Sequence, residues 1–138
     1  MRARDPLTPL AAARIVATPA ALDQFRWPTS TFALRTATDE ALVVTVPGRH
    51  EVIDVPADAV PDPHAVICRD TSWTGVWVTT TDAIDLLARH ADWEPPRQRP
   101  AFAQGLVAGL PVKLWVGRDM SLVIVPAAVP REFEERVR

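Results

Sequence analysis

The sequence predicts an α+β fold, with a mainly antiparallel sheet and a few short helices packed on one side of it. Runs rich in β-branched and aromatic residues come in pairs separated by turn residues, which is typical of antiparallel hairpins. Helical patterns occur in a few separate places instead of following every strand, so the alternation of a parallel α/β fold is absent. At 138 residues, 48% of them hydrophobic, the chain can bury a core as a single domain over residues 1–138.

The first 30 residues form a segment rich in proline and alanine. Within it, "TPAALDQF" (18–25) offers Thr18 as an N-cap and Pro19 at the first helical position. Serine and threonine oxygens cap helices well, and proline fits the first turn, so a short helix is expected here.

A strand pair is expected next. "TFALRTA" (31–37) and "EALVVTV" (40–46) are β-rich and are separated only by Thr38-Asp39, the spacing of a hairpin. "EVIDV" (51–55) could form a further short strand, and the proline- and aspartate-rich residues 56–64 are expected to form a loop.

The second half begins with two strands and a helix. "HAVICRD" (64–70) and "WTGVWVT" (73–79) have strand patterns, and the apolar period then becomes helical over residues 80–93. Thr81 or Asp82 can cap this helix. Its core-facing side is predicted to consist of Ile84, Leu87, Ala88 and Ala91.

Three strands and a closing helix are expected at the C-terminal end. Residues 101–126 contain three β-rich runs, with turns at Gly109 and at Gly117-Arg118-Asp119. "PREFEERVR" (130–138) starts with a proline, and it places Phe133 and Val137 on one side of a short helix.

Charge and cysteine content narrow the possible functions. A net charge of −2 and a pI near 5.9 give no electrostatic footprint for nucleic acid or for an anionic membrane. The single cysteine, Cys68, excludes an internal disulfide and favours a cytoplasmic location. Its apolar surroundings predict a small buried hydrophobic residue. The N-terminal apolar stretch is too short and interrupted for a signal sequence or a membrane span.

Nucleophile and metal patterns are weak. Ser72 lacks the Gly-x-Ser-x-Gly elbow, and Asp70 and Ser72, two apart in an extended segment, suit turn or capping bonds to the backbone. No pair among the histidines has the spacing of a zinc site, and no phosphate-binding or dinucleotide-binding glycine pattern occurs. We therefore expect neither a metal site nor a catalytic residue; the histidines are His50, His64 and His90.

Tryptophan is the most suggestive residue type that remains. Trp77 and Trp115 are expected in the core, whereas Trp73 and Trp93 suit either a core or a docking surface. Tryptophan buries a large area and dominates the binding energy of many interfaces. Trp73, Trp93, Asp70 and Ser72 are therefore the candidates for ligand or interface contacts. The fifth tryptophan is Trp27.

Four motifs follow one another in the second half of the chain: Asp70-Thr71-Ser72, Asp82-Ala83, Leu86-Leu87 and Pro111-Val112-Lys113-Leu114-Trp115. Their order resembles that in the gamma subunit of heterotetrameric sarcosine oxidase, itself similar to the folate-binding region of glycine-cleavage T-proteins. Asp70-Thr71-Ser72 matches the Asp-x-Ser that opens a strand in that family. The likeness covers most of the chain and is strongest over residues 66–137, although Thr80-Thr81 replaces the family's Gly-Pro.

The resemblance implies a non-catalytic small subunit of a sarcosine-oxidase-like flavoenzyme complex, which demethylates an N-methyl amino acid oxidatively. Flavin, NAD and tetrahydrofolate would then be bound by larger partner chains, and no catalytic residue carries over to this sequence. An alternative is a free-standing, T-protein-like module that binds tetrahydrofolate, with Trp73 stacking on the pterin and Asp70 hydrogen-bonding to it. A third alternative is an orphan domain that kept only the fold.

Overall fold

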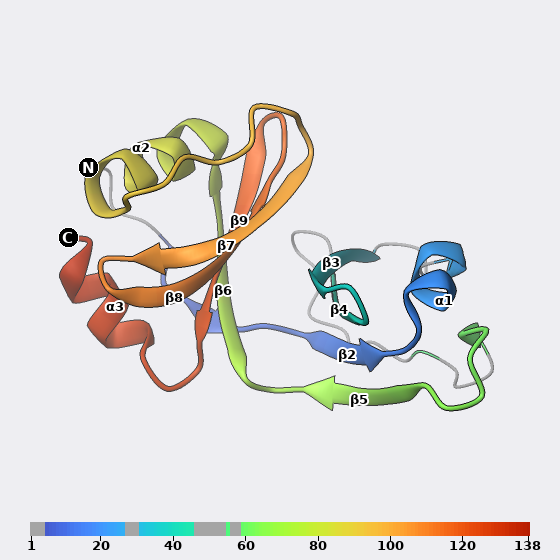
Figure 1. The fold of residues 1–138 in the computed structure, drawn as a ribbon. Coiled ribbons are helices and arrows are strands. Elements are labelled where there is room, and N and C mark those ends of the chain that lie inside the picture. The colour runs from blue at the N-terminus through green and yellow to red at the C-terminus, as the bar shows by residue number, and fades with distance from the viewer. Residues whose placement is uncertain (1–4, 27–30, 46–54, 56–58) are drawn as a thin grey trace. The chain divides into compact units, whose positions relative to one another are not determined.

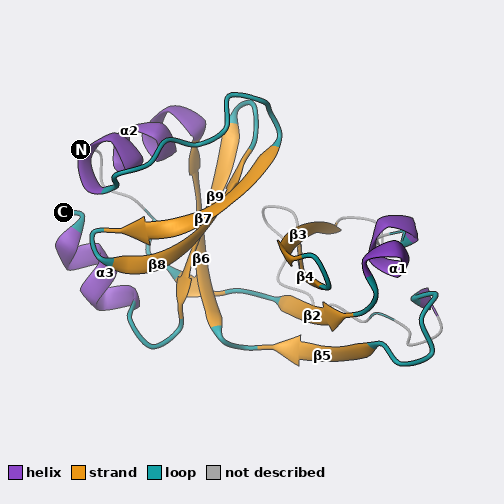
Figure 2. Cartoon of the chain, viewed as in Figure 1, coloured by secondary structure: helices purple, strands orange, loops and turns teal. Residues whose placement is uncertain are grey.

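The computed structural model describes residues 5–26, 31–45, 55 and 59–138 (Figure 1). It confirms the predicted α+β class, because every strand pair is antiparallel and the helices are few and short (Figure 2). Contacts group the described residues into two compact units. Unit 1 contains residues 5–9 and 72–138, and unit 2 lies within residues 10–71. The single domain over residues 1–138 stays a prediction.

Unit 1 is a five-stranded antiparallel sheet with two helices. The strand order is β1-β6-β9-β8-β7, so β1 and β7 lie at the two edges of the sheet. Its elements are β1 (Thr8–Pro9), β6 (Trp73–Thr79), α2 (Thr80–His90), β7 (Ala101–Val107), β8 (Leu110–Val116), β9 (Met120–Pro126) and α3 (Pro130–Arg136).

Both predicted turns between the last three strands are confirmed. Gly109 has φ +80° at the β7–β8 turn, a left-handed conformation that glycine adopts without a side-chain penalty. Arg136 of α3 donates to the carbonyl of Ala108 in the same turn, at 2.8 Å. At the β8–β9 turn, the N–H of Gly117 donates to the carbonyl of Met120 at 3.0 Å.

Helix α2 begins earlier than its capping pattern predicted. Thr79 is the N-cap, and its hydroxyl accepts from the N–H of Asp82 at 3.1 Å, so the assignment of the cap to Thr81 or Asp82 was wrong. Thr80 is buried, and its hydroxyl donates to the carbonyl of Gly117 at 2.9 Å. Ser121 lies 2.9 Å from the same hydroxyl. The start of the helix is thereby tied to the β8–β9 turn.

The core of unit 1 lies between α2, α3 and one face of the sheet. Phe133 and Val137 are buried in it, as the sequence predicted. The predicted face of α2 was right for Leu87, which is buried, and for Ala91, which packs against the core. It was wrong for Ile84, which is 40% exposed, and for Ala88, which is also exposed. The helix buries Ala83 and Leu86 in addition to Leu87.

Unit 2 is a four-stranded antiparallel sheet in the order β3-β4-β2-β5. Its capped helix and its β3–β4 hairpin are as predicted: the hydroxyl of Thr18 accepts from the N–H of Ala21, and Thr38-Asp39 connects the two strands. The central strand β2 was not predicted. The elements are β2 (Ala12–Val16), α1 (Pro19–Gln24), β3 (Thr31–Ala37), β4 (Glu40–Thr45) and β5 (Val66–Asp70). The strand predicted over 51–55 lies outside the described residues except for Val55, as does Val46 of the strand predicted over 40–46.

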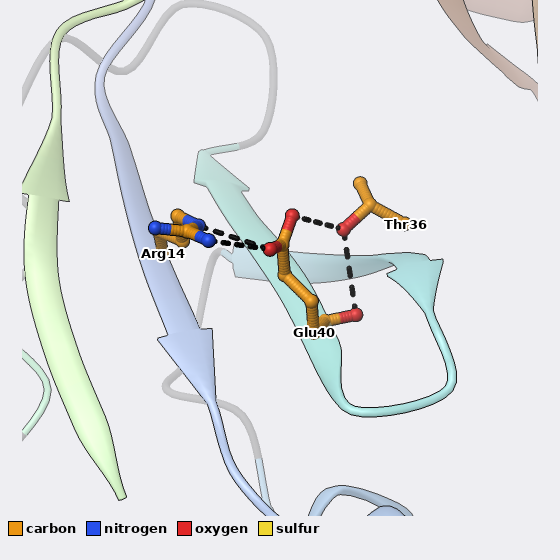
Figure 3. A network of polar contacts seen from close by, with 3 residues as sticks. All are labelled: Arg14, Thr36 and Glu40. Carbon is orange, nitrogen blue, oxygen red and sulfur yellow. Dashed lines mark hydrogen bonds and ion pairs between the residues drawn. The ribbon is translucent and has the colours of Figure 1, made fainter.

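Three strands of unit 2 are linked by a polar network (Figure 3). Arg14 of β2 donates to one carboxylate oxygen of Glu40 on β4 through Nε at 3.0 Å and Nη2 at 2.8 Å. Thr36 of β3 donates to the other oxygen at 2.8 Å. The hydrogen bond to Glu40 raises the pKa of Arg14. Because both partners of the ion pair are partly exposed, we assign the network to strand register more than to stability.

Asp62 ties the loop before β5 to the start of α1. Its carboxylate accepts from the backbone N–H groups of His64, at 2.8 Å, and Thr18, at 2.9 Å. These bonds, that of His64 first, hold the pKa of Asp62 below its ordinary value.

The stability of the protein should therefore depend on Asp62 at acid pH. A folded-state pKa below the unfolded one means that the stabilisation is present above the unfolded pKa and is lost as pH falls through the folded pKa. Melting midpoints measured between about pH 6 and about pH 2 should fall less steeply for Asp62→Asn than for the wild type. Asp39→Asn, a change at an exposed turn residue, is the control and should keep the wild-type slope. An unchanged slope in Asp62→Asn would contradict the assignment.

Cys68 does not occupy the buried position that its apolar neighbours predicted. It is exposed, as is Val66 at 56%, whereas Ile67 between them packs against the core of unit 2. The reason is that Cys68 lies on the face of the sheet that carries Arg14 of β2, its exposed partner in register. Alternate residues of β5 therefore face away from the core.

Candidate functional site

The motif Asp70-Thr71-Ser72 lies where the chain passes from unit 2 to unit 1. Asp70 ends β5 opposite Ala12 of β2, and the carbonyl of Ser72 accepts from the N–H of Ala127 at 2.8 Å. The backbone at Ser72 is thus bound to the segment just after β9. The bond is made by the backbone, so the turn or capping bonds expected of the Asp70 and Ser72 side chains stay a prediction.

The register also changes at this motif. Ala12 pairs with Asp70 in the four-stranded sheet, and Pro9 pairs with Thr74 in the five-stranded sheet. Two residues lie between the pairs on one side (10–11) and three on the other (71–73). Asp70 and Trp73 therefore belong to separate ladders with different registers.

Trp73 begins β6 on the sheet face opposite the helices. Thr74, Val76 and Val78 point to the helix-covered side, so Trp73 and Trp77 point to the other. The ammonium of Lys113 lies 4.7 Å from the centre of the Trp73 ring, a cation–π contact. Lys113 also donates to the side-chain oxygen of Gln104 at 2.8 Å, which fixes its position.

Trp77 and Trp115 form an edge-to-face pair on the same side of the sheet. Their ring centres are 5.8 Å apart, with 72° between the ring planes. Strand β9 lies between theirs, and Leu122 is in register with both. The two rings therefore lean together over Leu122, which is fully buried. The prediction that both tryptophans are core residues was wrong, since each is only partly buried. We call Trp73, Trp77 and Trp115 with Lys113 the indole face.

Trp93 lies on the other side of the sheet, in the segment after α2. Its indole N–H donates to the carbonyl of Leu106 at 2.9 Å, and its ring packs against the helix-covered core. A side-chain carbon at Gly105 would lie 2.6 Å from the indole nitrogen, so the ring occupies the space above this glycine. Trp93 is thus held on β7 by a hydrogen bond and by close packing.

The four candidate residues do not form one site. Asp70 belongs to unit 2, whereas Ser72, Trp73 and Trp93 belong to unit 1. Within unit 1, Trp73 and Trp93 lie on opposite faces of the sheet. A single pocket built from all four is excluded by this arrangement of unit 1.

The predicted absence of a metal site stays a prediction. His64 lies in the loop whose backbone Asp62 binds, His90 ends α2, and His50 lies outside the described residues, as does Trp27. Among the described residues, no group of three or more His, Cys, Asp or Glu side chains could hold a metal ion.

A groove beside α2 is the feature that was not predicted from the sequence. It has a volume of about 780 Å³ and runs between the exposed side of the helix and the segment that follows it. The signal was present in the sequence, because α2 has apolar residues on two adjoining stripes and only one can face the sheet. The groove is lined by Ile84, Leu87, Ala88, Ala91, Asp92, Trp93, Glu94, Pro95, Arg97 and Arg99.

Comparison with known proteins assigns this protein to no class beyond its α+β fold. No protein-family model matches the sequence, and a search of curated proteins finds no match. No helix in the described part of the chain is both long and apolar enough to cross a membrane.

Proposed function

We propose that this chain is a non-catalytic small subunit of a cytoplasmic, heteromeric flavoenzyme complex, similar to the gamma subunit of sarcosine oxidase. The indole face is the observation that carries the proposal. Three tryptophans gathered on one side of a sheet, each partly buried, resemble the clustered aromatic anchors that supply most of the energy of protein interfaces. A larger flavin-binding partner would bury this face further.

Hydrogen bonds at two of the candidate residues support the same assignment. The backbone of Ser72 is bound to Ala127, and the N–H of Trp93 is bound to Leu106. In the proposed complex the oxidative demethylation and its flavin, NAD and tetrahydrofolate sites belong to the partner chains. This chain contributes surface and architecture.

Affinity purification of the tagged chain from its native organism tests the proposal. We expect larger flavin-containing subunits to co-purify with the wild type and to be lost with Trp73→Ala or Lys113→Glu, which alter the indole face. Arg131→Glu reverses a charge on an exposed residue of α3 and should leave the complex intact. Co-purification should fall at least about tenfold for loss of one central anchor.

Two results would overturn the proposal. One is recovery of the chain as a stable monomer that binds none of its co-expressed neighbours. The other is turnover of an amine by the isolated chain. Saturable quenching of its tryptophan fluorescence by tetrahydrofolate, with no partner present, would favour the folate-binding module instead.

A further inference from the structure

Helix α2 has an outward apolar stripe that the core does not use. Ala83, Leu86 and Leu87 fill the interior of unit 1, while Ile84 and Ala88 are exposed and line the groove. A surface helix normally turns polar residues outward, so the exposed pair Ile84 and Ala88 gives the groove an apolar wall.

The opposite wall of the groove is the segment that follows the helix. In Figure 1 this segment turns back after α2 and runs beside it toward the start of β7. Trp93 anchors the wall through its bond to Leu106 and its packing over Gly105. The groove is therefore built from α2 and from the fixed segment of residues 91–100, which we call the strap. Its volume, about 780 Å³, falls in the range of small-molecule sites, about 300–1,000 Å³.

Charged residues divide the strap into an acidic and a basic end. Asp92 and Glu94 come directly after the helix, and Arg97 and Arg99 follow, nearer to β7. None of the four forms an ion pair with any residue in the described ranges. Arg99 is the only one of the four that is partly buried, so its charge is the least screened by water.

A carboxylate is the ligand group that this basic end fits best. The guanidinium group presents a planar fork of N–H donors that matches a carboxylate in a bidentate way. Arg99 donates through Nη1 to the carbonyl of Gln98 at 3.3 Å, which leaves its Nη2 and Nε donors available for an incoming anion. Apolar walls and a basic end together suit an amphiphilic anion.

We propose that the groove binds a small amphiphilic carboxylate. The apolar body of the ligand lies along Ile84, Ala88 and Ala91 and against Trp93, and its carboxylate is held by Arg97 and Arg99. Binding is noncovalent and involves no reaction. The proposal is independent of the subunit function, because the groove lies on the helix-covered side of the sheet and the indole face lies on the other.

Calorimetric titration of the full chain with three probes of equal chain length tests the proposal: decanoate, decanol and decylammonium. We expect saturable binding of decanoate, weaker binding of decanol and the weakest binding of decylammonium. Arg97→Gln/Arg99→Gln should weaken decanoate binding about tenfold or more and leave decanol binding unchanged. Ile84→Asp should weaken the binding of both.

Matched controls separate the groove from general stickiness. Glu94→Gln changes a charged residue that lines the same groove and should leave decanoate binding equal or tighter. Arg131→Gln removes a positive charge on α3 and should have no effect. The proposal is overturned by absence of saturable decanoate binding, by equal binding of decylammonium, or by unchanged decanoate affinity in the double arginine variant. Circular dichroism confirms that each variant is folded before titration.

Discussion

Replacing Phe133 with alanine should lower the free energy of unfolding of unit 1 by about 3–5 kcal/mol, the cost of a Phe-to-Ala change in a packed core. Phe133 is 2% exposed and belongs to the cluster between α3 and the sheet. The change removes a buried ring and leaves a cavity that the neighbouring residues can fill only in part. Urea unfolding followed by tryptophan fluorescence measures it, because four of the five tryptophans lie in unit 1.

Two further variants make this result decisive. Leu106→Ala removes a large apolar side chain that is 60% exposed, and it should cost within about 0.5 kcal/mol. Phe133→Leu keeps most of the volume and should cost less than about 1.5 kcal/mol, so it stays measurable if the alanine variant does not fold. Equal losses for Phe133→Ala and Leu106→Ala would contradict the placement of α3 on the core.

Replacing Gly105 with alanine should destabilise unit 1 by about 1–3 kcal/mol, as forced overpacking does. The added carbon would lie 2.6 Å from Nε1 and 2.8 Å from Cε2 of Trp93, distances that no ordinary contact allows. The indole has to move, and its hydrogen bond to Leu106 then breaks. The unfolding midpoint in urea and the emission maximum of tryptophan should both shift.

A double-mutant cycle identifies the cause of that loss. In a Trp93→Ala background the added carbon meets no ring, so Gly105→Ala should cost close to nothing there. The difference between the two backgrounds is the coupling energy of the contact. The same loss in both backgrounds would show that Gly105 matters for its strand alone and that Trp93 is not packed over it.

Elements set by local chemistry were predictable from the sequence. Thr18 with Pro19 marks the start of α1, and Pro130 marks the start of α3. The turns at Gly109 and Gly117 separate strands that follow one another directly in the chain. Capping bonds and tight turns involve residues only a few positions apart, so a short window of sequence is enough to find them.

The face of α2 was not predictable, since its apolar residues form two adjoining stripes. The helical period allows Ile84 with Ala88 or Ala83 with Leu87 to face inward. The choice depends on the angle at which the helix meets β6 and β9. Residues that are distant in the chain determine this angle. The run of hydroxyl and acidic residues from Thr79 to Asp82 likewise offers several possible caps.

Errors at Cys68, Trp77 and Trp115 also have a nonlocal cause. Cys68 is exposed because it lies on the same face of the sheet as Arg14, and that placement depends on the pairing of β5 with β2, far away in the chain. Trp77 and Trp115 alternate with core residues of their own strands. When a strand has apolar residues on both sides, its sequence pattern does not show which side the helices cover.

The pairing of β1 with β6 has a consequence for the path of the chain. Thr8 and Pro9 lie opposite Gly75 and Thr74, and all of residues 10–71 intervene between these partners. Topologically, the four-stranded part of the chain is an insertion into a hairpin of the five-stranded sheet. The chain leaves the five-stranded sheet after Pro9 and rejoins it at Trp73, on the neighbouring strand.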